Sequence, residues 1–136
     1  MKKIIFAMSA VSIIALSLLS SSDGVAEVQN QDRTGAPGSA QSCIQCHNQP
    51  GAMTASSSMT ITNIIGEEVS TYIAGDTYEV SFNVISNTAV GYGFQATSVF
   101  PDGSNAGEFT NPGTSVQIES VESRHIVEHS TPSSTG

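Results

Sequence analysis

Basic side chains are scarce in this chain of 136 residues, which contains four lysines and arginines against twelve acidic residues. Beyond residue 26 the only basic residues are Arg33 and Arg124. So acidic a chain repels phosphate backbones, which argues against nucleic-acid binding. The sequence also lacks a second long apolar run, so no further membrane-spanning helix is expected. It shows neither an internal repeat nor a long stretch of 3.6-residue periodicity, which argues against a mainly helical fold.

The one long apolar segment lies at the N-terminus. Two lysines precede residues 4–20, which are almost wholly apolar or small, and the small residues Gly24 and Ala26 fit cleavage before Glu27. An uncleaved membrane anchor is the alternative, because the run is of borderline length for crossing a bilayer. The serine-rich flank without basic residues favours a cleaved signal. We therefore predict a signal peptide over residues 1–26, export to the periplasm, cell surface or exterior, and no stable membrane span after cleavage.

After the leader, a polar, turn-rich segment at 27–42 is expected to be a loop, and from residue 58 onward the sequence alternates with the period of β-strands. Strands are expected at 59–64, 77–85, 92–99, 116–118 and 125–128. Frequent turn residues between them are typical of an antiparallel sandwich or barrel. A two-sheet sandwich usually needs about seven strands. We therefore expect residues 43–136 to be an all-β domain whose last strands are missing.

The chemistry of the chain is concentrated in Cys43-Ile44-Gln45-Cys46-His47. This spacing is the attachment signature of a c-type haem, in which two thiols add to the two vinyl groups and the adjacent histidine binds iron. Haem is attached outside the bacterial cytoplasm, so the export signal and the motif agree. Gly38 and Pro50 leave room only for a loop or a short helix. We predict one covalent haem c, with Cys43 and Cys46 as its attachment points and His47 as an axial ligand.

Other uses of the two cysteines remain open. A disulfide, as in exported oxidoreductases, normally sits between a strand and a long helix, and the sequence lacks that frame. A zinc site is a second alternative, formed by Cys43, Cys46, His125 and His129. The long separation between its cysteines and its histidines is unlike that of a zinc finger. A plain structural disulfide is the weakest alternative, because so short a loop constrains little of the unfolded chain.

A haem iron has a second axial position. The candidates are His129, His125, Met53 and Met59. The main one is His129, and His125 is an alternative on the same strand face, because side chains alternate along a strand. Met53 and Met59 lie closer to the motif in sequence. The alternative is that both histidines are solvent-exposed and both methionines are packing residues. A methionine ligand would raise the reduction potential relative to histidine.

The order of several short motifs resembles the choice-of-anchor V domain of exported bacterial proteins, which is similar to the Reelin-type (reeler) β-sandwich. The matching segments are Thr34-Gly35-Ala36-Pro37-Gly38, the Cys motif, Tyr72-x-x-Gly75-x-x-Tyr78-x-Val80, Gly91-Tyr92-Gly93-Phe94-Gln95, Asp102-Gly103-x-x-Ala106-Gly107-x-Phe109 and Val127-Glu128-His129-Ser130. The resemblance covers residues 33–130 and implies an immunoglobulin-like (reeler-type) sandwich. It marks Cys43, Cys46 and His47 as haem-binding and points to His129. Ala74 replaces a common proline, and the tryptophan-containing closing strands are absent, since the chain has no tryptophan.

These observations predict a small exported monohaem cytochrome that passes single electrons to a redox partner protein. The acidic surface would steer it toward a basic partner. The alternative is an extracellular surface or adhesion module in which the Cys pair or the haem is structural. A catalytic haem domain is a third possibility, and it would require an open axial position. Because fold and function are separable, the resemblance alone does not decide among them.

Overall fold

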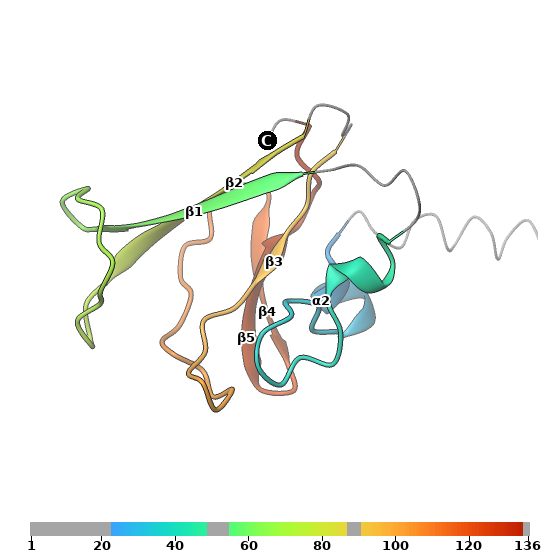
Figure 1. The fold of residues 1–136 in the computed structure, drawn as a ribbon, viewed down its shortest axis with the longest axis horizontal. Helices are drawn as coiled ribbons and strands as arrows, with labels where there is room; N and C mark the ends of the chain where they lie inside the picture. Colours follow the sequence, from blue (N-terminus) through green and yellow to red (C-terminus); the bar gives the residue numbers. More distant parts are fainter. Residues whose placement is uncertain (1–22, 49–54, 87–90, 135–136) are drawn as a thin grey trace, which may run out of the picture. The chain divides into compact units, whose positions relative to one another are not determined.

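The computed structural model describes residues 23–48, 55–86 and 91–134 (Figure 1). Within them the chain is mostly β, which confirms the expected all-β, antiparallel class. The elements are α2 (Val25–Gln29), the 3₁₀ turn η1 (Cys43–Gln45), β1 (Ser56–Asn63), β2 (Tyr78–Ile85), β3 (Gln95–Ala96), β4 (Val116–Val121) and β5 (Arg124–His129). Two compact units are present, Met1–Pro50 with Gly93–Ser133 and Gly51–Tyr92 with Ser134–Gly136.

The first unit is built on an antiparallel sheet of three strands in the order β3-β5-β4. β4 and β5 form a hairpin closed by Glu122 and Ser123, whose φ angles are 49° and 71°. Two consecutive left-handed residues match the twist of a hairpin, but the usual sequence signal is Asn-Gly or Asp-Gly. Glu-Ser carries no such signal, so the sequence did not locate the turn. Both strands run closer to it than the predicted 116–118 and 125–128.

The core of this unit is small. Ala26, Val121 and Ile126 are buried together, so α2 packs on the sheet face that carries Val121 and Ile126. The expected loop at 27–42 thus begins with helical residues. Local periodicity could not reveal this helix, because it is only five residues long and is capped from a distant strand.

The second unit is a hairpin in which β1 pairs with β2 along eight residues of each strand. Met59 lies opposite Phe82, and Ile61 lies opposite Val80. Their alternation was predicted correctly, yet Met59 is 57% exposed and Phe82 39%. Within the described part of the chain, no helix is long and apolar enough to cross a membrane. The predicted signal segment up to residue 22 and Met53 lie outside the described residues.

Candidate functional site

The Cys motif occupies a single exposed turn, as the flanking Gly and Pro residues predicted. η1 begins at Cys43, and the backbone N–H groups of Cys46 and His47 both donate to the Cys43 carbonyl, at 3.2 and 3.1 Å. Both cysteines are free and exposed, His47 is exposed, and Ile44 between them is 70% exposed. The turn therefore presents two thiols and an imidazole at the surface of one short segment.

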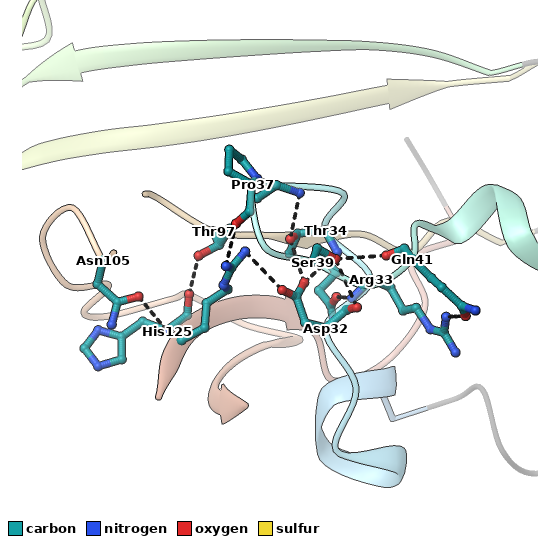
Figure 2. A network of polar contacts seen from close by, with 12 residues as sticks. Asp32, Arg33, Thr34, Pro37, Ser39, Gln41, Thr97, Asn105 and His125 are labelled. Atoms are coloured by element: carbon teal, nitrogen blue, oxygen red, sulfur yellow. Dashed lines mark hydrogen bonds and ion pairs between the residues drawn. The ribbon is translucent and has the colours of Figure 1, made fainter. Parts of the chain in front are cut away.

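The loop before the motif is closed by its own polar side chains (Figure 2). The Asp32 carboxylate accepts hydrogen bonds from the backbone N–H of Thr34 at 2.9 Å and from its hydroxyl at 2.6 Å. Thr34 pairs with Ser42 as an isolated bridge, directly before the motif. The Ser39 hydroxyl donates to the Asp32 carbonyl at 3.2 Å. The loop therefore brings its two ends together and holds the start of the Cys turn.

Arg124 of β5 anchors this loop to the sheet. Its Nη1 forms an ion pair with Asp32 Oδ2 at 3.1 Å, and its Nη2 donates a hydrogen bond to the Pro37 carbonyl at 2.6 Å. Gly38 leaves room for this guanidinium, because a Cβ there would lie 2.8 Å from Nη2. Gly103 makes a similarly close approach, with a Cβ position 3.1 Å from the Pro37 carbonyl oxygen.

A second anchor lies nearer the thiols. The backbone N–H of Arg33 donates to the side-chain carbonyl of Gln95 on β3, and the Gln95 amide donates to the Gln31 carbonyl at 3.2 Å. The Cys43 thiol in turn donates to the Arg33 carbonyl at 3.7 Å, within the longer range of a sulfur hydrogen bond. A continuous chain of contacts therefore runs from β3 to the first cysteine.

His129 is fixed by the backbone that leads into β3. Its Nδ1 lies 3.1 Å from both the N–H and the carbonyl oxygen of Phe94, so its tautomer decides which contact is a hydrogen bond. The ring also packs on Gly93, where a Cβ would lie 2.6 Å from Cε1. Both contacts with the Phe94 backbone are made by Nδ1, so Nε2 is the ring nitrogen that they leave unused.

His125 is held differently, because its contacts in Figure 2 are made by its backbone. Its carbonyl accepts from the Thr97 hydroxyl at 2.7 Å, and its N–H donates to Asn105 Oδ1 at 3.2 Å. No group of three or more His, Cys, Asp or Glu side chains that could hold a metal ion occurs among the residues described. The described geometry therefore offers no support for the zinc alternative.

Side chains alternate between the two faces of β5, and this alternation puts the candidate histidine ligands on the face opposite the one that holds the loop of the Cys motif. Ile126 and Glu128 face α2, and Arg124, on the same face, holds the loop of the Cys motif. His125 and His129 belong to the opposite face of the strand. The described contacts therefore unite Cys43, Cys46 and His47 on one turn but do not bring His129 to it.

Glu128 is the polar residue that the sequence did not reveal. It is fully buried at 0% exposure, although a carboxylate is rarely buried without partners. It lies opposite Gln95 in β3 and Gln117 in β4, and both side-chain amides donate to it at 3.1 Å. Gln95 and Glu128 both occur in the segments that carry the family resemblance, which was the one available signal.

The residues of the turn fit a covalently attached haem, because the donor set is complete: two free, exposed thiols and an adjacent exposed imidazole. Of the alternative axial ligands, Met59 lies on β1, in the second unit. Comparisons with models of protein families, with curated proteins and with solved structures found no match to this chain.

Proposed function

We propose that this protein is an exported monohaem c-type cytochrome that passes single electrons to a partner protein. The observation that supports this proposal most is that the Cys turn exposes two free thiols beside a histidine. Cys43 and Cys46 are free thiols on one exposed 3₁₀ turn, with His47 next to them. A haem bound there would supply a one-electron redox couple, with Cys43 and Cys46 as its covalent attachment points and His47 as a nitrogen ligand of its iron.

Electron transfer needs close approach of a partner rather than a substrate cavity. The Cys turn is exposed over Cys43–Asn48, so a partner protein can reach it. The chain has a formal net charge of −8, which favours association with a basic partner and makes the association rate depend on salt. This role requires no acid–base residue at the site.

We extend the proposal to the fold, as an immunoglobulin-like, reeler-type sandwich of the choice-of-anchor V kind. Its support is the way in which the resembling segments meet. Gln95 of one segment hydrogen-bonds Glu128 of another, and Gly103 of a third approaches Pro37 within the loop before the motif. Segments that are far apart in sequence thus share contacts within the first unit.

For the second axial position we propose His129. Histidines that bind metals commonly donate the other ring N–H to a backbone carbonyl, which fixes the tautomer and orients the ligand nitrogen. The contact of His129 Nδ1 with the Phe94 carbonyl at 3.1 Å matches that requirement. Against the assignment, the loop of the Cys motif is anchored to the other face of β5.

The test of the ligand is His129→Ala, with His125→Ala as the matched control two strand repeats away on the same face. If His129 binds iron, its loss should convert a low-spin spectrum to high-spin and change the potential, while the control stays low-spin. An unchanged spectrum for His129→Ala would overturn this assignment and leave Cys43, Cys46 and His47 untouched.

The function itself is tested by the redox behaviour of protein made in a host that matures c-type haem. We expect a reversible one-electron reduction with c-type absorption bands, and a Soret band that cyanide and peroxide do not shift. A protein without haem bands would contradict the cytochrome and favour the binding module. A Soret band that shifts with peroxide would instead indicate an open iron and catalytic chemistry.

A further inference from the structure

The most unusual polar group of the described chain is the buried carboxylate of Glu128. Its two oxygens accept four hydrogen bonds. Oε1 accepts from the Glu27 backbone and the Gln117 amide, and Oε2 accepts from the Ala26 backbone and the Gln95 amide. All four donors are uncharged, whereas buried charges are normally balanced by an opposite charge. The site is therefore built for a negative group and leaves its charge uncompensated by these donors.

The surroundings increase the negative potential. Burial raises the pKa of Glu119 on β4, and the nearby charges of Glu27 and Glu128 raise it further. The carboxylates of Glu27 and Glu128 are thus both close enough to Glu119 to disfavour its charged form. A positive charge placed among them would be stabilised more strongly than one on an open surface.

Two of the four donors flank the bond that the export signal marks for cleavage. The backbone N–H of Glu27 lies 3.0 Å from Glu128 Oε1, and that of Ala26 lies 2.9 Å from Oε2. Gly24, two residues earlier, approaches so closely that a Cβ there would lie 2.3 Å from Oε1. The small residues at 24 and 26 therefore meet the needs of a signal peptidase and, in the uncut chain, those of the Glu128 site.

We propose that removal of the signal at Ala26–Glu27 creates an α-ammonium group on Glu27 that forms a buried ion pair with Glu128. Water adds across the peptide bond, so that Ala26 leaves with a new carboxylate and Glu27 retains the amine, which is protonated at neutral pH. The proposal rests on the predicted signal and is independent of haem. Cleavage removes the donor of Ala26 but replaces a neutral N–H by a full positive charge at the position facing Oε1.

The remaining contacts hold the new terminus in place. Gln117 donates to Glu27 Oε2 at 2.8 Å, and Gln95 donates to the Gln31 carbonyl at 3.2 Å, so residues on both sides of the short terminal segment stay anchored. Loss of Gly24 also frees the space beside Oε1 that the extra ammonium hydrogens need. Because Ala26 is 4% exposed and helical in the uncut chain, cleavage must precede the docking of this segment.

The sequence provides a direct test, because lysine occurs only at positions 2 and 3. A chain of residues 27–136 has its α-amino group as its sole primary amine. Intact mass of the exported protein should give Glu27 as the first residue. In the folded protein, acetylation by an N-hydroxysuccinimide ester should then be at least about tenfold slower than in concentrated urea, the factor that a local opening free energy of about 1.4 kcal/mol produces.

The matched control is a chain with Gly-Ser-Gly added before Glu27, whose amine should react as fast folded as unfolded. Glu128→Gln should restore fast acetylation in the chain that begins at Glu27. Should that variant fail to fold, as judged by circular dichroism, Gln117→Ala should give a smaller increase in rate. A mature terminus other than Glu27, or equal acetylation rates for the native and extended chains, would overturn the ion pair. A haem defect would leave these rates unchanged, so the two proposals fail separately.

Discussion

The contact between Gly93 and His129 makes a quantitative prediction for Gly93→Ala. A Cβ at Gly93 would lie 2.6, 2.8 and 2.9 Å from the Cε1, Nδ1 and Nε2 atoms of His129, well inside normal contact. The backbone tolerates alanine there, because φ of Gly93 lies outside the left-handed region. The imidazole must therefore move and lose its 3.1 Å contact with Phe94.

The expected change in the free energy of unfolding combines two destabilising effects with one stabilising effect. Overpacking costs about 1–3 kcal/mol, and a lost hydrogen bond costs about 0.5–1.5 kcal/mol. Alanine in place of glycine returns about 0.4–1 kcal/mol by restricting the unfolded chain. Because the ring is the mobile end of its side chain, we expect the lower part of this range, a net loss of about 1–2 kcal/mol.

A double-mutant cycle measured by urea denaturation isolates the steric effect. In a His129→Ala background the obstacle is gone, so Gly93→Ala should stabilise the protein by about 0.4–1 kcal/mol. The sign of the substitution should thus reverse between the two backgrounds. The same free-energy change in both would refute the packing of His129 on Gly93.

Two further predictions concern the loops of the first unit. Arg124→Met should lower the free energy of unfolding, measured by urea denaturation, by about 1–3 kcal/mol. It removes both the ion pair with Asp32 and the hydrogen bond to the Pro37 carbonyl. A change below about 0.5 kcal/mol would show that Arg124 does not anchor the loop. The pKa of Asp102 is lowered chiefly by a hydrogen bond from the Ser104 side chain and secondly by one from the Ser104 backbone. The stability that this carboxylate contributes is therefore present at neutral pH and is lost as pH falls through its depressed pKa. Ser104→Ala should raise that pKa toward its ordinary value in an NMR titration of the carboxyl group, and an unmoved pKa would show that the hydroxyl does not stabilise the charge.

The positions of most strands and of the Cys turn were predictable, because they depend on residues close together in the sequence. The alternation of apolar and polar residues predicted the central residues of β1, β2, β4 and β5. Gly38 and Pro50 limited the Cys motif to a short turn, which η1 forms. The hairpin end at Glu122-Ser123 escaped prediction, because its left-handed angles have no matching residue signal.

The long-range features could not be read from the sequence. α2 is capped by Glu128, 102 residues away from Ala26, and no local pattern joins the two. The burial of Glu128 depends on Gln95 and Gln117 lying opposite it in neighbouring strands, which only the strand register determines. For the same reason, alternation predicted that His125 and His129 share a face but not which face the loop of the Cys motif would use.

The central claim is covalent haem attachment, and intact mass under denaturing conditions tests it most directly. Protein made with c-haem maturation should retain its colour after unfolding and show the polypeptide mass plus one haem, with the addition lost in the Cys43→Ser, Cys46→Ser double variant. A bare polypeptide mass, lower by two hydrogens for a Cys43–Cys46 disulfide, would contradict the cytochrome.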